Sequence, residues 1–169
     1  MCIRDRYGRV PLGLIRKNNF NRRFFHLNKD VNFPIHFTSQ IIGFKNMELS
    51  YDPTTIGSFV LSGGCYFQAL NGIKLGKNFL FAPGVKLISS NHGIENKQEI
   101  EKAPPIIIGD NVWLGANVII LPGVKLGNNL VVGAGSVVTK SFPDKLVIAG
   151  NPAKIIKKKS KQCDTVTCT

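Results

Sequence analysis

His92 is the residue of this chain best suited by type and position to moving a proton near neutral pH. It closes the stretch Ser89-Ser90-Asn91-His92, at the start of a polar segment over residues 89–105 that ends in two prolines. An imidazole with a pKa near 6.5 can take the proton of a hydroxyl group as that group attacks an electrophile. One ring nitrogen must then be held by an acceptor, for which Glu95 or a backbone carbonyl would serve. The alternative interpretation is an ordinary surface-loop histidine.

A six-residue period over residues 108–143 defines the elements that must position His92. An aliphatic residue opens each hexad, glycine follows it in four of the six, and an apolar or small residue stands four places after the opener. This period matches neither an α-helix nor an alternating strand, and it is the hexapeptide signature of a parallel β-helix. We predict a triangular coil of short strands with these openers stacked inside: Ile108, Leu114, Ile120, Leu126, Val132 and Val138. The alternative is a β-sandwich with glycine turns.

The same phase appears from Leu75 to Leu87 and is then lost before Ile108. The interruption predicts a loop over residues 89–105, extruded from a rigid scaffold, with His92 at its start. Loops of this kind usually carry function. Glycines in the hexads, such as Gly109 and Gly127, are expected where the coil bends.

A single all-β domain accounts for the 169 residues. Within it we expect a non-native leader over 1–6, a lead-in of short strands over 7–46 that caps the open end of the β-helix, the β-helix over 47–150, and a C-terminal segment with a basic tail over 151–169. No apolar run is long enough to span a bilayer and no signal-peptide pattern is present, so we expect a cytoplasmic protein.

A formal net charge of +12 raises the question of a nucleic-acid partner. The lysine-rich tail offers neither aromatic stacking platforms nor a helix for a groove, and we expect no nucleic-acid binding. Its lysines have three other interpretations: a solvated face, a patch in peripheral contact with a membrane, or contacts with a phosphate-bearing small ligand. The four cysteines form no CxxC pair, so we expect free thiols, with Cys65 in apolar packing rather than acting as a nucleophile.

Several segments of the chain together resemble the hexapeptide-repeat acetyltransferases. They cover residues 89–92, 107–116, 133–140 and 149–154, while residues 33–39 and 64–69 look like the branch that O-acetylates sugars in capsule or lipopolysaccharide assembly. The resemblance implies a left-handed parallel β-helix closed by a short C-terminal helix. It also implies a homotrimer with active sites between subunits.

The activity implied by this resemblance is direct acetyl transfer from acetyl-CoA to a saccharide hydroxyl, with His92 as the base. Backbone N–H groups around Gly115 and Ala116 would stabilise the oxyanion. A γ-class carbonic anhydrase shares the fold but needs three histidines, and only His92 lies in the predicted β-helix, so we expect no metal. Two alternatives stay open: an N-acetyltransferase of an amino sugar or drug, and a non-catalytic binding scaffold.

Site residues follow from the same resemblance. Those matching the acetyl-CoA site are Trp113, Gly115, Ala116, Ala134, Thr139, Lys140, Lys154 and Lys157. The small residues leave room for the pantetheine arm, and the lysines would face the phosphates, although Lys154 and Lys157 replace arginine seen in some members and lose its bidentate geometry. Trp113 has interface packing as its alternative role. For the saccharide we expect Gln68, Asn71 and Asn91, because amides both donate to and accept from hydroxyls.

Overall fold

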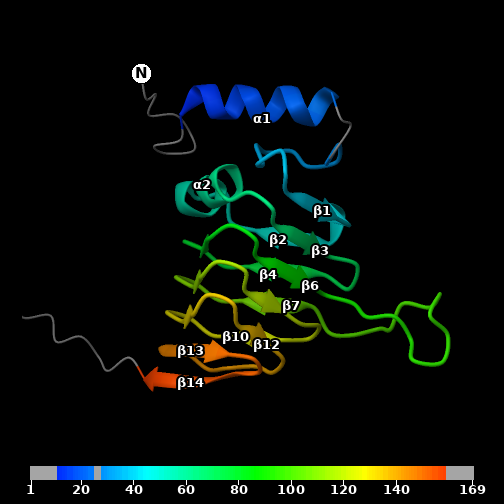
Figure 1. Ribbon diagram of the computed structural model, residues 1–169, viewed down its shortest axis with the longest axis vertical. Coiled ribbons are helices and arrows are strands. Elements are labelled where there is room, and N and C mark those ends of the chain that lie inside the picture. The colour runs from blue at the N-terminus through cyan, green and yellow to red at the C-terminus, as the bar shows by residue number, and fades with distance from the viewer. Residues whose placement is uncertain (1–10, 25–27, 159–169) are drawn as a thin grey trace, which may run out of the picture.

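The computed structural model describes residues 11–24 and 28–158, and these form a stack of coils with helices at one end (Figure 1). The predicted leader over 1–6 and the tail over 159–169 lie outside the described residues, as do His26, Cys2, Cys163 and Cys168.

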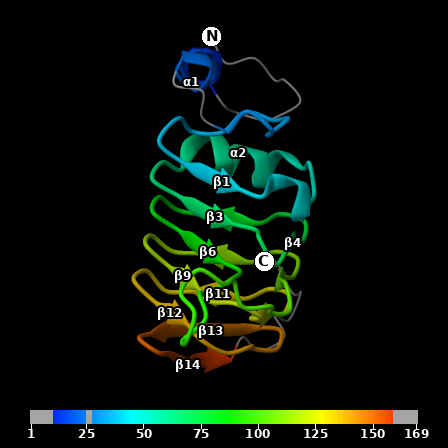
Figure 2. The ribbon, with the colours of Figure 1, turned by 90° about the vertical axis from the view of Figure 1, so that its right-hand side faces the viewer.

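Three sheets make up the sides of the stack (Figure 2). Sheet 1 contains β1 (Gln40–Ile42), β3 (Tyr66–Gln68), β6 (Lys86–Ile88), β9 (Ile119–Ile120) and β12 (Val137–Val138). Sheet 2 contains β2 (Met47–Leu49), β4 (Ile73–Leu75), β7 (Ile106–Ile108) and β10 (Lys125–Leu126). Sheet 3 contains β5 (Leu80–Phe81), β8 (Trp113–Leu114), β11 (Val131–Val132), β13 (Leu146–Gly150) and β14 (Ala153–Lys158). The strands pair in parallel except β13 with β14, as a coil that visits the three sheets in turn requires.

The predicted interior of the coil is confirmed. All six hexad openers are at most 2% exposed, and the residues four places later are buried as well, among them Val112, Val118 and Leu130. Burial of each aliphatic side chain contributes roughly 1.5–3 kcal/mol. The hexad therefore supplies two inward residues per face, and their stacking forms one continuous core.

Tight turns join sheet 2 to sheet 3, and polar side chains link these turns from coil to coil. Oδ1 of Asp110 accepts from the backbone N–H of Lys77, and Oδ1 of Asn128 accepts from that of Asp110, both at 2.8 Å. At Gly109 a Cβ atom would lie 2.8 Å from the backbone carbon of Gly127. The glycine predicted at this bend is thus required by the close approach of successive coils.

The cap at the N-terminal end contains a long helix where short strands were predicted over 7–46, and among the described residues of that range only Gln40–Ile42 forms a strand. Helix α1 (Leu12–Phe24) lies across the end of the stack, followed by β1 and the short 3-10 helix η1 (Phe44–Asn46) (Figure 1). Helix α2 (Pro53–Leu61) takes the place of a sheet 3 strand in the first coil. Its flanking Ser62 hydroxyl donates to the carbonyl of Phe81 at 2.7 Å, and the Thr55 hydroxyl accepts from the N–H of Phe79 at 3.0 Å. These hydroxyls pair with backbone groups along the edge of sheet 3 at β5, groups that would otherwise be open to pairing with another strand.

The predicted C-terminal helix is also absent over residues 151–158, where the chain forms strand β14. Gly150 has a φ of 106°, and Pro152 has no N–H to donate, so the chain reverses and returns along β13. β14 pairs antiparallel with β13 and covers its free edge. The β-branched pair Ile155 and Ile156 suits a strand better than a helix.

Asp52 fastens helix α2 to the coil that follows it. Its Oδ1 accepts from the N–H groups of Thr54 and Thr55, and its Oδ2 accepts from the N–H of Asn78 at 3.1 Å. Burial raises the pKa of Asp52, but hydrogen bonds from Thr55 and Asn78 outweigh burial and leave this pKa below its usual value.

We expect Asp52→Ala to lower the free energy of unfolding by about 1–2 kcal/mol, as loss of a helix N-cap does. Because the pKa of Asp52 is lower in the folded state, its stabilisation is present above the ordinary carboxyl pKa and disappears as the pH falls through the folded value. Urea unfolding at pH 7 and at pH 3 measures both effects. Asp52→Asn keeps one acceptor oxygen and should lose less of the free energy of unfolding than Asp52→Ala. An alanine variant as stable as the wild type at pH 7 contradicts the role of Asp52 as a helix cap.

Candidate functional site

The loop that carries His92 leaves the stack between β6 and β7 and projects from it (Figure 1). Its two limbs pair briefly: His92 forms an antiparallel bridge with Ile100, and the N–H of Glu101 donates to the carbonyl of Asn91 at 2.9 Å. The side chains of Asn91, His92 and Glu95 are exposed. Among the described residues the His92 imidazole has no hydrogen-bond partner, and none joins it to Glu95. Both ring nitrogens are open to a ligand.

The other two predicted saccharide-binding residues lie at the base of this loop. Oε1 of Gln68 accepts from the N–H and the hydroxyl of Ser90, at 3.3 and 3.0 Å. Nδ2 of Asn71 donates to two backbone carbonyls, those of Ser89 and Glu101. Gln68 therefore keeps its amide nitrogen for a ligand, while the amide nitrogen of Asn71 is used inside the protein.

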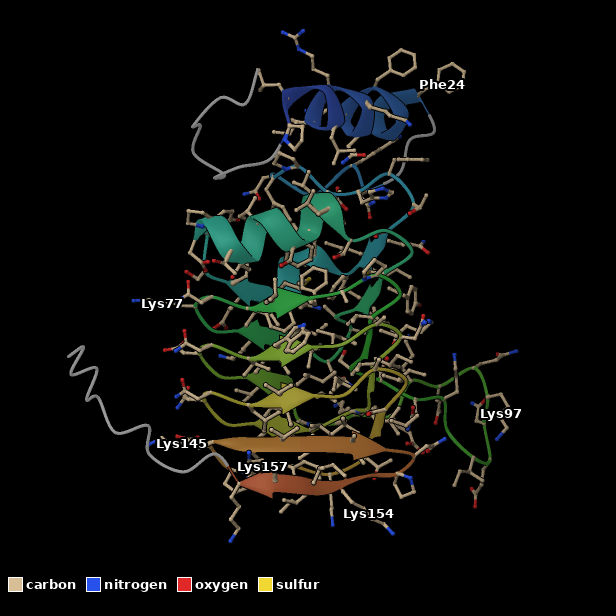
Figure 3. All side chains as sticks on the ribbon, turned by 60° about the vertical axis from the view of Figure 1, so that its left-hand side comes forward. Phe24, Lys77, Lys97, Lys145, Lys154 and Lys157 are labelled. Carbon is tan, nitrogen blue, oxygen red and sulfur yellow. The ribbon has the colours of Figure 1, made fainter. Side chains whose placement is uncertain are left out.

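Sheet 3 brings together three of the predicted acetyl-CoA residues on its outer face. Trp113 of β8 is in register with Val131 of β11, which aligns with Val147 of β13 and then with Lys157 of β14. Residues in register project to the same side of a sheet, and three strand spacings separate Trp113 from Lys157 by about 14 Å. Lys154 lies opposite Ala149, two register positions from the Val147–Lys157 pair, and therefore on the same face of the sheet. Figure 3 shows Lys154 and Lys157 together on β14, at the end of the stack farthest from α1.

The small residues predicted for the pantetheine arm line the corner between sheets 3 and 1. Ala116 and Ala134 occupy equivalent positions on successive coils, and the N–H of Gly135 donates to the carbonyl of Ala116 at 2.8 Å. Gly115 packs under Ala134, where a Cβ atom would lie 2.6 Å from the Ala134 nitrogen. Its own N–H donates to the carbonyl of Val132 at 2.9 Å. Of the two N–H groups predicted to stabilise an oxyanion, only that of Ala116 is without a partner among the described residues.

Thr139 and Lys140 lie apart from this face. They follow β12, the last strand of sheet 1, at the same corner of the coil from which the His92 loop leaves after β6, two strands away. The ammonium of Lys140 lies 5.8 Å from the centre of the Phe142 ring. One chain thus carries two groups of predicted site residues, the loop edge with His92 and the outer face of sheet 3 with Trp113.

Cys65 packs inside the stack and contributes no exposed thiol. It is 2% exposed, and its sulfur contacts the carbonyls of Ser62, Gly63 and Ala82 at 3.6–3.8 Å. Burial raises the pKa of Cys65 and keeps the thiol protonated. The structure supports its interpretation as a packing residue.

Leu80 was not predicted as a site residue, yet it stands in register with Trp113 on the outer face of sheet 3. These two side chains are 45% and 48% exposed, so they open an apolar patch to solvent. Both occupy the sixth position of a hexad, which points outward. Large apolar residues at that position are the sequence signal that identifies this patch.

The described part of the chain contains no helix long and apolar enough to cross a membrane. It also contains no group of three or more His, Cys, Asp or Glu side chains able to hold a metal ion.

Comparison with known proteins identifies the family. The family model described as the hexapeptide repeat of succinyl-transferase matches residues 105–140. A Dictyostelium discoideum protein that carries the name of an acetyltransferase is 43% identical over 133 residues, which are 71% of this chain and 70% of that protein. This chain belongs to the hexapeptide-repeat acetyltransferases. Another relative in the family, an Escherichia coli protein named for O-acetyl transfer in lipopolysaccharide biosynthesis, is 40% identical over 55% of this chain and 54% of its own length.

Solved structures of family members share the fold. A maltose O-acetyltransferase from Clostridium difficile 630 aligns with a TM-score of 0.54 and 27% identity, over 89% of this chain and 90% of that one. A galactoside acetyltransferase in complex with coenzyme A aligns with a TM-score of 0.50 and 29% identity, over 73% of this chain and 63% of that one. The architecture is therefore the left-handed parallel β-helix of this acetyltransferase family. The chain spans about half the length of the two yeast relatives it matches.

Proposed function

We propose that this acetyltransferase transfers the acetyl group of acetyl-CoA to a hydroxyl group of a saccharide in cytoplasmic polysaccharide biosynthesis. The observation that carries the proposal is the outer face of sheet 3, where an exposed tryptophan and two lysines stand in successive outward-facing rows beside a corner of small residues. The lysines suit the phosphates of a nucleotide, and the corner leaves room for an extended chain. Names of the relatives supply the acceptor class, since maltose, galactosides and lipopolysaccharide are all saccharides.

His92 is the proposed general base. Its neutral imidazole accepts the hydroxyl proton as the saccharide oxygen attacks the thioester carbonyl carbon. The negative charge that develops on the carbonyl oxygen is stabilised by the N–H of Ala116, which has no partner in the part of the chain that the structure describes. The carbon–sulfur bond then breaks, the thiolate receives the proton from the imidazolium, and the acetyl group stays on the saccharide oxygen. No covalent enzyme intermediate is needed.

Transfer in this scheme takes place between two copies of the chain. His92 and Trp113 belong to different sides of the coil, because His92 follows sheet 1 and Trp113 lies on sheet 3. A homotrimer can set the loop edge of one copy against the sheet 3 face of the next, so that one donor is shared by two chains.

Thiol release from acetyl-CoA tests the proposed activity. The purified chain is assayed against neutral mono- and oligosaccharides, amino sugars and aminoglycosides at equal concentration. We expect release that depends on a neutral saccharide. Release with amines alone supports the N-acetyltransferase alternative, and no release with any of them, despite coenzyme A binding, supports a binding scaffold.

We expect replacement of both Lys154 and Lys157 by alanine to raise the KM for acetyl-CoA about 2- to 30-fold with little change in kcat. Two exposed ion pairs of about 0.2–1 kcal/mol each give this range. The difference in KM between the variant and the wild type should shrink at high salt, because salt screens the attraction between the lysines and the phosphates. Initial rates at about 50 and 500 mM salt measure both effects. Lys140→Ala is assayed as a separate variant, because Lys140 follows β12 of sheet 1 and lies apart from the outer face of sheet 3.

Lys77→Ala with Lys125→Ala is the matched control, because it removes two exposed lysines that lie outside the outer face of sheet 3. An unchanged donor KM in the Lys154 and Lys157 variant excludes these lysines from the donor site. If anionic vesicle binding falls instead, the lysines form a peripheral membrane contact.

A further inference from the structure

The loop that carries His92 is closed at its base by a single side chain. Nδ2 of Asn71 donates to the carbonyl of Ser89, before His92, at 3.0 Å, and to the carbonyl of Glu101, after His92, at 2.8 Å. The backbone N–H of Asn71 also donates to the Ser89 hydroxyl at 3.0 Å. Ser89 is fully buried, so the loop departs from a fixed point of the stack.

The first limb of the loop is held as far as Asn91, the residue before His92. The N–H and the hydroxyl of Ser90 donate to Oε1 of Gln68. The carbonyl of Asn91 accepts a hydrogen bond from the N–H of Glu101. Only the torsions of His92 itself then separate the imidazole from an anchored backbone. Movement of Glu101 away from Ser89 would break the pairing of the two limbs and release His92 from its position.

We propose that Asn71 is a positioning residue that acts on catalysis through His92, which deepens the proposed function and rests on it. An amide NH₂ has two donor hydrogens, and Asn71 uses both to join the two ends of the loop. The amide oxygen of Asn71 has no hydrogen-bond partner among the described residues. Holding a base in its productive position is worth a large factor, since a displacement of about 1 Å can cost roughly 100-fold in rate.

The chain contains its own control for this role. Asn46 lies at the same corner of the coil as Asn71, between sheets 1 and 2, but one coil earlier. Its Nδ2 donates to the carbonyls of Ala69 and Leu70 at 3.1 and 3.2 Å. Asn46 and Asn71 therefore make the same pair of amide-to-carbonyl bonds at equivalent corners. Only the bonds of Asn71 span a loop that carries a candidate base. A purely structural role predicts equal consequences for the two residues, and a positioning role does not.

Steady-state kinetics of Asn71→Ala and Asn46→Ala, with thermal melting of each, provide the first test. We expect Asn71→Ala to lower kcat about 10- to 100-fold while the KM for acetyl-CoA stays within about twofold. Asn46→Ala should lower the melting temperature similarly and leave kcat close to wild type. Asn71→Asp, a same-sized side chain that donates no hydrogen bond when ionised, should behave like alanine. Equal loss of kcat in the Asn46 and Asn71 variants, or wild-type kcat in both Asn71 variants, overturns the proposal.

A double-mutant cycle with His92→Ala tests whether Asn71 acts through the histidine. We expect Asn71→Ala to cause little further loss in the His92→Ala background. The same loss in both backgrounds overturns the positioning role. If His92→Ala by itself leaves kcat unchanged, the proposed base is wrong, which is a separate outcome.

Hydrogen exchange of the loop supplies a readout that does not depend on activity. Loss of the Asn71 bonds should speed exchange at the N–H groups of Gly93 and Glu101, which pair the two limbs, without speeding exchange in β8 or β11. Unchanged exchange at these two amides in both Asn71→Ala and Asn71→Asp contradicts the joining of the loop ends by Asn71.

Discussion

Replacement of His92 by alanine is expected to lower kcat by about 10²–10⁴-fold, the range that loss of a general base produces. The KM for acetyl-CoA should change little, because the proposed donor contacts lie on sheet 3 and His92 lies on the loop edge. Measurement of kcat and KM on a confirmed acceptor, with matched melting temperatures, checks this result.

His92→Gln serves as the companion variant, because an amide can still hydrogen-bond the hydroxyl but cannot take its proton at neutral pH. It should be nearly as inactive as the alanine variant. Ile94→Ala is a control at the loop tip, where the side chain is 83% exposed. Turnover of His92→Ala within a few-fold of wild type would remove His92 from the base role.

Activity is expected to disappear when the protein is diluted to the point where it dissociates into monomers. The base and the donor face occupy different sides of one chain, so a productive site requires a second copy. Light scattering should give the mass of three chains at working concentration, and specific activity should fall in step with the loss of that species. Adding acetyl-CoA should delay the dissociation, because a ligand bound between chains stabilises the assembly. A monomer that retains full specific activity contradicts the shared site.

The β-helix could be predicted from the sequence because its signal is local. The first and fifth residues of a hexad point into the coil regardless of which residues the neighbouring coils contain. The burial of Leu114 and Val118 therefore follows from their positions in the hexad alone. The loop was equally visible, since a run that breaks the period cannot continue the coil. The helices were not predicted, because their contacts are distant: the buried amide of Asn18 in α1 donates to the carbonyl of Val60 in α2.

The C-terminal strand and the loop base depended on long-range pairing as well. The lysine-rich run with Ile155 and Ile156 has no clear period, and the free edge of β13 decides that it becomes a strand. Asn71 could be named as a polar residue near the site, but its bonds to Ser89 and Glu101 join residues 18 and 30 positions away. No pattern of spacing reports such contacts, and the candidate site therefore needed the structure.

The location of the acetyl group after one turnover tests direct transfer to a hydroxyl most directly. The trimer is mixed with isotopically labelled acetyl-CoA and an accepted saccharide, and both the intact protein mass and the saccharide spectrum are followed with time. Direct transfer predicts an alkali-labile acetyl ester on a saccharide oxygen, no acetylated protein at any time, and ester formation slowed about 10²–10⁴-fold in His92→Ala. Label on the protein before it reaches the saccharide, or on a nitrogen of the acceptor, would contradict direct transfer to a hydroxyl.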